Sequence, residues 1–328
     1  MMKCFSYLSS NRPLLQVRKM VCAEGREKGT ELFRVTNEAG LDFDVLIDRC
    51  FGIGDLRLHG QMISYASETG IVHPTYYNAS GYEWLRSFGG GFLVTCGLDQ
   101  VGEPFQSEAE QAGLHGRVDN IPAEQVSHRV FEKDGSLWAE LSGTVVQAKH
   151  QGEHLQLRRN IRLRHDARKI WMSDEITNCG GESQPFMLLY HINFGFPFLR
   201  PDALVELPSA AVQGWKPASK EREDQWRRVP EIEAEPLDML WLHKVIPDAE
   251  GRGGVCVKNG SRAVHILYPV EELPVLAQWE LIKEHNYVLA IEPTNSHLLG
   301  RQWERENGTL RTLAPGEKKT IAMEFEFE

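Results

Sequence analysis

Apolar and polar residues alternate along this chain far more often than they recur at the three- to four-residue spacing of an amphipathic helix. The alternation is clearest over residues 155–164 and at the carboxyl end, where every second residue from Ile321 to Phe327 is apolar. Such period-2 patterns predict strands with one buried face. Further strands are expected at residues 43–47, 137–147, 170–177, 186–191, 254–258, 263–268 and 287–291.

Few segments have helical spacing, and residues 82–87 and 274–284 each predict a short helical turn. Clusters of Gly, Pro, Asn and Asp separate the expected strands. No internal repeat, low-complexity run or Pro/Ser-rich linker divides the sequence. We therefore predict an all-β fold with one domain spanning residues 1–328, a large antiparallel β-sandwich whose inner faces bury the alternating apolar residues.

The sequence contains 36 Lys and Arg residues against 46 Asp and Glu residues, a formal net charge of −10. This balance argues against nonspecific binding to nucleic acid or to an anionic membrane surface, and it favours a small neutral ligand as the partner. Residues 1–16 lack the apolar core of a signal peptide, and no later stretch reaches the roughly 20 apolar residues of a membrane helix, so a cytoplasmic location is expected. An exposed edge strand leaves a homodimer open.

The cysteines and two charged motifs favour structural roles. Six cysteines without a CxxC pair indicate reduced thiols rather than a zinc ribbon or a disulfide framework. The segment from His150 to His154 matches the HxxEH string of one metalloprotease class, but that chemistry needs a helix. Gly152 and the alternation that follows favour a β-turn with exposed histidines instead, so no metal is expected. The adjacent Asp48 and Arg49 favour an internal ion pair over a position at a pocket edge.

Two titratable residues stand at the expected ends of apolar strands. His191 follows the run 186–190, and a histidine where a buried strand opens into a loop keeps a functional pKa near neutrality. The alternative is a hydrogen-bonded structural histidine. Glu292 follows the run 288–291 and precedes Pro293, which cannot continue a central strand. A carboxylate facing a pocket there has the raised pKa of a general base, and the alternative is a solvated carboxylate at the rim.

Two loop segments carry further candidates. His115 has glycines nearby on both sides, which allow another group to approach the backbone closely, although a plain loop histidine fits equally well. Arg86 follows Trp84 and precedes a run of three glycines that lacks the spacing of a phosphate-binding loop. An arginine beside an indole is suited to hold the hydroxyls of a sugar while the indole covers its ring.

Together these residues resemble the aldose 1-epimerase (galactose mutarotase-like) superfamily, and more closely its DUF4432 branch. The motifs that carry the resemblance extend over nearly the whole chain: WLR at 84–86, GL at 97–98, LHGR at 114–117, TN at 177–178, YHINFG at 190–195 and IEP at 291–293. The resemblance implies a β-supersandwich with a sugar-binding cleft across one sheet, and a reaction without cofactor or metal.

The resemblance also implies roles for the candidates. His191 would protonate the ring oxygen of a pyranose while Glu292 takes the proton of the anomeric hydroxyl, so that the ring opens and recloses as the other anomer. His115 would help to position the ring oxygen. The family's binding aspartate falls in the region of Asp238 and His243, of which His243 is the preferred counterpart. The candidate substrate-binding residues are Arg86, His243, Trp84, Arg117 and Asn193.

The leading hypothesis is therefore an aldose 1-epimerase that interconverts the α and β anomers of a free or modified sugar. A second hypothesis is a carbohydrate-binding or sensing protein that has lost useful catalysis. A third is an isomerase or lyase that acts on an acidic or deoxy sugar in the same cleft, because acid/base pairs serve several chemistries. Arg117 or Arg49 would then supply a cation for an anionic substituent.

Overall fold

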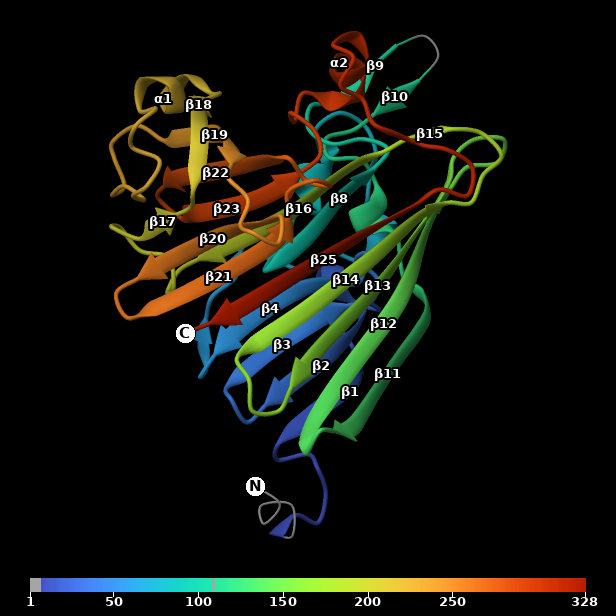
Figure 1. Cartoon of the computed structure of the whole chain (residues 1–328), viewed down its shortest axis with the longest axis vertical. Helices are drawn as coiled ribbons and strands as arrows, with labels where there is room; N and C mark the ends of the chain where they lie inside the picture. Colours follow the sequence, from blue (N-terminus) through green and yellow to red (C-terminus); the bar gives the residue numbers. More distant parts are fainter. Residues whose placement is uncertain (1–6, 108–109) are drawn as a thin grey trace.

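The computed structural model describes residues 7–107 and 110–328, and its antiparallel strands form two large sheets (Figure 1). The 11-stranded sheet follows the order β1-β2-β3-β4-β8-β16-β23-β22-β19-β18, with β5 paired to β4. Its strands are β1 (Leu15–Val21), β2 (Glu31–Asn37), β3 (Leu41–Leu46), β4 (Gly52–Leu58), β5 (Gln61–Met62), β8 (Leu93–Leu98), β16 (Met187–Gly195), β18 (Ser209–Gly214), β19 (Leu237–Val245), β22 (Val275–Lys283) and β23 (Asn286–Thr294).

The 8-stranded sheet follows the order β11-β12-β13-β14-β25-β21-β20-β17, and in Figure 1 its central strands lie in front of β2, β3 and β4. Its strands are β11 (Glu124–Lys133), β12 (Ser136–Ala148), β13 (His154–Arg164), β14 (Lys169–Asn178), β17 (Leu204–Glu206), β20 (Arg252–Asn259), β21 (Arg262–Pro269) and β25 (Lys318–Phe327). The predicted all-β sandwich is therefore confirmed.

Short elements complete the fold. The small strands are β6 (Tyr65–Ala66), β7 (Gly90–Gly91), β9 (Phe105–Gln106), β10 (Gln111–Ala112), β15 (Gln184–Pro185) and β24 (Thr312–Leu313). The helices are α1 (Pro217–Glu221), α2 (Gly300–Glu306) and the 3-10 turns η2 (Gly25–Glu27), η3 (Pro74–Tyr76), η4 (Glu83–Arg86) and η5 (Val118–Asn120). Both α-helices and the β9-β10 hairpin lie at the end of the molecule opposite the residues that directly precede β1 (Figure 1).

The inner faces of the two sheets enclose the hydrophobic core, as the alternation predicts. Every second residue of β13 from Leu155 to Leu163 is buried, and all of these residues are apolar except Arg159. In β25, Ile321, Met323 and Phe325 point inward in the same way. Phe325 contacts Phe92, which directly precedes β8 of the facing sheet, with ring centroids 5.3 Å apart. The strongest sequence signals therefore mark the strands that line the core.

A charged network crosses this core behind the centre of the 11-stranded sheet. Arg159 is fully buried and donates two hydrogen bonds to Asp174, at 2.8 and 2.6 Å. It also donates to the Thr95 hydroxyl of β8, and the Tyr190 hydroxyl of β16 donates to Asp174 at 2.7 Å. A buried ion pair is tolerated because hydrogen bonds satisfy its remaining polar atoms. The network fixes β16 and β8 against the second sheet.

The prediction of a helical turn at residues 274–284 is wrong, because Val275–Lys283 forms β22, an inner strand between β23 and β19. Both faces of its first half are covered, since Leu276, Ala277 and Gln278 are all fully buried. Burial on both faces removes the period-2 alternation from the sequence. Pro274, directly before the strand, is then easily taken for the first residue of a helix. The short turn expected at residues 82–87 is confirmed as η4.

Several smaller predictions can be checked in the described residues. His150 is exposed in the turn before β13 and His154 is exposed as the first residue of that strand, which confirms the β-turn interpretation of the HxxEH string. Cys22, Cys50, Cys96, Cys179 and Cys256 are free thiols, while Cys4 lies outside the described residues. Within those residues, every helix is too short or too polar to cross a membrane. The homodimer remains a prediction.

Candidate functional site

The register of β16 and β23 places His191 opposite Glu292. The flanking pairs are Ile192 with Ile291 and Leu189 with Thr294, so the two side chains lie on the same face of the sheet. Nε2 of His191 is 3.4 Å from Oε1 of Glu292. His191 is 4% and Glu292 2% exposed. Two residues far apart in the sequence thus form one buried acid/base pair.

Neither residue ends its strand, contrary to the sequence-based expectation. β16 continues past His191 to Gly195, and β23 continues through Pro293 to Thr294. Pro293 has no N–H, and the ladder between these strands skips Tyr190 and His191, which lie opposite Pro293 and Glu292. The proline is therefore accommodated by a local gap in the ladder, with the strand intact on either side.

Burial determines which residue of this pair is protonated. It raises the pKa of Glu292 to about 8, and the positive charge of Lys216 opposes that rise. Burial lowers the pKa of His191 to about 4, and a contact with the Asn193 side chain opposes that fall. Both directions follow from the cost of a charge in a low-dielectric environment. At neutral pH the pair therefore holds one proton, mainly on Glu292.

His115 approaches the pair from a tightly packed loop. The Gly116 backbone has φ of 72°, and a Cβ atom added there would lie 2.5 Å from the Gly97 carbonyl oxygen, so the close approach expected of the neighbouring glycines is confirmed. The Gly102 N–H points at Nδ1 of His115 at 3.4 Å, which leaves Nε2 to carry the proton. Burial, reinforced by His191 and Lys216, lowers the pKa of His115 to about 3.

These three residues lie in a cleft of about 500 Å³, a suitable volume for a small ligand. Its aromatic residues include Tyr65, Trp84, Phe88 and Trp279, and its polar residues include His115, His191, Lys216, Asp238, Asn286 and Glu292. The Phe88 and Trp279 rings lie 5.3 and 5.7 Å from the His191 ring, measured between centroids. Trp84 stacks on Phe88 at 4.8 Å. The acid/base pair is thus surrounded by flat apolar surfaces.

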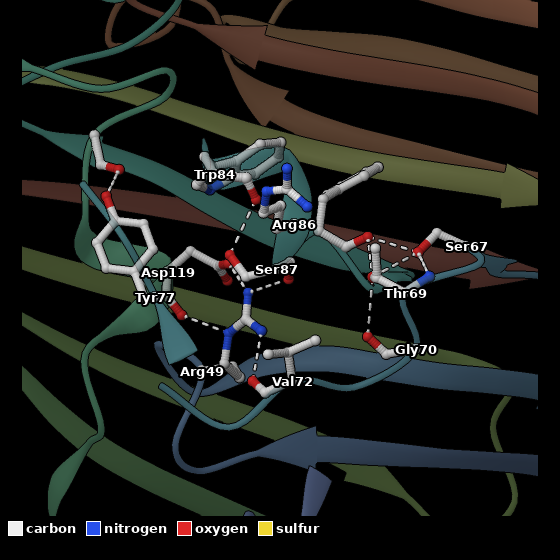
Figure 2. Close-up of polar contacts among 12 residues, drawn as sticks. Arg49, Ser67, Thr69, Gly70, Val72, Tyr77, Trp84, Arg86, Ser87 and Asp119 are labelled. Carbon is white, nitrogen blue, oxygen red and sulfur yellow. Dashed lines mark hydrogen bonds and ion pairs between the residues drawn. The ribbon is translucent and has the colours of Figure 1, made fainter. Parts of the chain in front are cut away.

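Two of the five predicted binding residues, Arg86 and Arg117, lie outside the cleft. Arg86 is 74% exposed and pairs with Glu83 at 2.9 Å, while the neighbouring Trp84 is buried and lines the cleft. Figure 2 shows the Arg86 guanidinium without a bond to any of the residues drawn around it. Arg117 is exposed at the start of η5 and does not line the cleft. Of Trp84 and Arg86, only the tryptophan is placed to touch a ligand in the cleft.

His243 also lies outside the cleft, because strand alternation turns it to the opposite face of β19. Asp238 and Leu240 line the cleft, whereas His243 is buried beside Trp226 on the reverse face. Asp238 is therefore the better placed of the two residues considered for the family's aspartate. Asn193 lies on the same face as His191, but it is fully buried beneath the surface and donates to the His191 carbonyl oxygen at 3.1 Å.

Asp238 forms a polar cluster in the cleft wall with Lys216 and Trp279, two residues that the sequence did not single out. Nζ of Lys216 donates to both carboxylate oxygens of Asp238 at 2.7 and 2.6 Å, and the Trp279 indole N–H donates to Asp238 at 2.9 Å. Trp279 was not identified because residues 274–284 were expected to form a helical turn instead of a strand that lines the cleft. One signal for Asp238 was available, since it alternates with residues of a partly open face while His243 alternates with Met239 and Trp241.

The internal ion pair of Arg49 is confirmed with a different partner. Arg49 pairs with Asp119, whereas Asp48 accepts a hydrogen bond from the Glu31 N–H at 2.8 Å. The guanidinium also donates to the carbonyl oxygens of Val72 and Ser87 (Figure 2). Because these loops lead to η4, Arg49 supports the segment that carries Trp84 and has no free charge for a ligand.

The fold is shared with several solved structures. A proposed aldose 1-epimerase from Klebsiella pneumoniae has a TM-score of 0.90 at 21% identity, over 95% of this chain and 83% of the other. A galactose mutarotase-like protein from Clostridium acetobutylicum has a TM-score of 0.64 at 14% identity, over 96% and 98%. Galactose 1-epimerase from Lactobacillus acidophilus has a TM-score of 0.61 at 12% identity, over 96% and 99%. At these identities the similarity shows the galactose mutarotase-like fold.

The search of curated proteins gives no match. A family model described as a domain of unknown function, DUF4432, matches residues 27–327, which includes both partners of the acid/base pair and nearly all of the two sheets. The resemblance seen in the sequence motifs is thereby confirmed, and the chain belongs to the DUF4432 family.

Proposed function

We propose that this protein interconverts the α and β anomers of a free sugar by acid/base opening of the sugar ring. The observation that carries the proposal is the His191–Glu292 pair, in which a general acid and a general base lie 3.4 Å apart within an aromatic cleft. The fold of proteins named as aldose 1-epimerases supports the same reaction class at a coarser level.

The reaction conserves the single proton of the pair. In the ring-opening direction the Glu292 carboxylate takes the proton of the anomeric hydroxyl, the bond between C1 and the ring oxygen breaks, and the protonated His191 gives its proton to that oxygen. Glu292 is then protonated and His191 neutral, which is the arrangement that burial favours. Rotation about C1–C2 and reversal of both transfers close the ring as the other anomer.

The remaining groups of the cleft suit a neutral monosaccharide. The Nε2–H of His115 is available to donate to the ring oxygen or a neighbouring hydroxyl. Asp238 is partly exposed and can accept from a hydroxyl in addition to its bonds with Lys216 and Trp279. The Trp279 and Phe88 rings offer flat faces against which the C–H groups of a pyranose pack.

The test is exchange NMR of anomeric protons across a panel of aldoses, uronic acids and deoxy sugars, with wild type and Glu292→Gln. We expect the wild type to accelerate exchange for at least one sugar and the variant to lose that acceleration. Acceleration that persists in Glu292→Gln would refute the assigned base. Thermal stabilisation by a sugar without faster exchange would identify a sugar-binding protein instead.

A further inference from the structure

The cleft extends well beyond the acid/base pair. Glu292 and Asn286 lie on the same face of β23, because an even number of residues separates them, and both line the cleft. At about 3.4 Å per residue, the strand places their backbones about 20 Å apart. A pyranose ring with its hydroxyl oxygens spans only about 6 Å, given single bonds of about 1.5 Å. A monosaccharide bound at the pair therefore does not reach the far end of the cleft.

The register of β22 and β23 gives this extension an apolar floor with a polar far end. Lys283 lies directly opposite Asn286 at that end. Nearer to Glu292, Leu281 and Trp279 point to the same side of β22 and line the cleft. Sugar rings present C–H groups on their flat faces and hydroxyls at their edges, so they can pack on such a floor and bind at its end.

Four polar side chains at the far end form what we call the distal cluster, namely Tyr65, Glu68, Lys283 and Asn286. The Tyr65 hydroxyl donates to Oδ1 of Asn286, and Nδ2 of Asn286 donates to the two carboxylate oxygens of Glu68 at 3.3 and 3.2 Å. Glu68 is exposed and keeps acceptor sites for further hydroxyls. Lys283 is half-buried, and within residues 7–107 and 110–328 no ion pair joins it to a carboxylate. The cluster thus offers both acceptors and a donor.

The charges of the distal cluster favour a neutral ligand group. Glu68 and Lys283 have opposite charges and line the same end of the cleft, so an anion there would face a carboxylate and a cation would face an ammonium group. A hydroxylated neutral group can instead donate to Glu68 and accept from Lys283. In the cleft wall, the charge of Lys216 is already balanced by Asp238.

Building on the proposed function, we propose that the distal cluster binds a second neutral sugar unit, so that the preferred substrate is a reducing disaccharide. The reducing unit lies at the acid/base pair, because its C1 and ring oxygen must reach Glu292 and His191. Its C4 and C6 hydroxyls lie away from C1 and carry the second unit over Leu281 toward Lys283 and Asn286.

The first test compares anomer exchange of maltose, cellobiose and melibiose with that of glucose, the reducing unit of all three. The wild type should show kcat/KM at least about tenfold higher for one of the disaccharides, because a hydrogen bond to a charged group contributes a factor of about 10 or more. Glu68→Ala and Lys283→Met should each lower this ratio of disaccharide to glucose by about 3- to 10-fold, through KM for the disaccharide.

Glu284→Ala is the matched control, because Glu284 is an exposed carboxylate in the turn between β22 and β23 that does not line the cleft. It should keep the ratio of the wild type. A ratio near one in the wild type would overturn the proposal. A high ratio that neither Glu68→Ala nor Lys283→Met lowers would also overturn it, since the second unit would then bind elsewhere.

Calorimetric titration of the wild type at anomeric equilibrium separates this inference from the proposed function. Tighter binding of a disaccharide than of glucose, reduced in Glu68→Ala and Lys283→Met, supports the distal cluster even if no anomer exchange is accelerated. Accelerated exchange without tighter disaccharide binding would overturn the second unit and leave the proposed function standing. Glucose 6-phosphate tests the competing ligand class, and its binding more tightly than every disaccharide would overturn the neutral unit by showing that Lys283 binds an anion.

Discussion

Glu292→Gln should stabilise the protein in a pH-dependent way while removing activity. The folded-state pKa of Glu292 is about 8 against an ordinary value of 4.5, because burial penalises the carboxylate. The stability associated with the protonated form is fully present below pH 4.5 and is lost as the pH rises toward 8. With about 1.4 kcal/mol per pKa unit, the loss at pH 7 is about 3 kcal/mol, and an uncharged glutamine avoids it.

Glu280→Gln is the matched control for this experiment. Glu280 is fully buried on β22, burial raises its pKa to about 8 as well, and it faces away from the cleft because its neighbours Trp279 and Leu281 line it. The two carboxyl groups therefore carry the same linkage cost on opposite faces of one sheet. The unfolding free energy of both variants relative to wild type should increase with rising pH. Only Glu292→Gln should lose anomer exchange.

The measurement is denaturant unfolding of wild type and both variants at pH 5, 7 and 8. The difference in unfolding free energy between Glu292→Gln and wild type should grow by about 3 kcal/mol from pH 5 to 8, on top of any constant offset from the amide. A difference that stays flat over this range would refute the argument that burial raises the pKa of Glu292. Loss of exchange in a folded Glu280→Gln would refute the assignment of catalysis to the cleft face.

Three further outcomes are expected. His191→Asn should keep the fold and lower the rate of anomer exchange by about 10²- to 10⁴-fold, as measured by exchange NMR, because the general acid is lost; near-normal exchange would contradict its role. Arg86→Ala should change kcat/KM less than about twofold, since the exposed guanidinium pairs with Glu83 outside the cleft, and a tenfold rise in KM would show a missed contact. Arg159→Met should destabilise the fold by about 3–5 kcal/mol in denaturant unfolding, because it leaves the Asp174 charge buried without its partner, and a loss below 1 kcal/mol would show that water compensates.

The sequence predicts the fold well where each strand has one covered face. In β13 and β25 the inward residues are apolar and the outward ones polar, so the period is visible. The prediction fails at residues 274–284 because β22 is an inner strand of the larger sheet, between β23 and β19, and both faces of its first half are covered. A strand covered on both faces has no polar face to reveal it.

The site was predictable in part for a similar reason. His191, Glu292 and His115 stand out because they interrupt apolar or glycine-rich runs, and the cleft brings all three together. The choice of His243 was wrong because one step along a strand reverses the face of a side chain, and His243 shares its face of β19 with the apolar Met239 and Trp241. The prediction that Arg86 binds the ligand together with Trp84 was wrong, because a short 3-10 turn rotates successive side chains away from each other.

The alternation of side chains between the two faces of a strand, which places His243 outside the cleft, also explains how β16 holds His191. Tyr190 points into the core, where its hydroxyl donates to Asp174 in the network of Arg159, and the next residue, His191, points into the cleft. A buried ion pair adds little net stability compared with apolar packing, but it fixes the strand that passes over it. In the proposed reaction His191 is the general acid, which must be held in position to act, so the rigid polar anchor directly behind it would serve that role more than it serves stability.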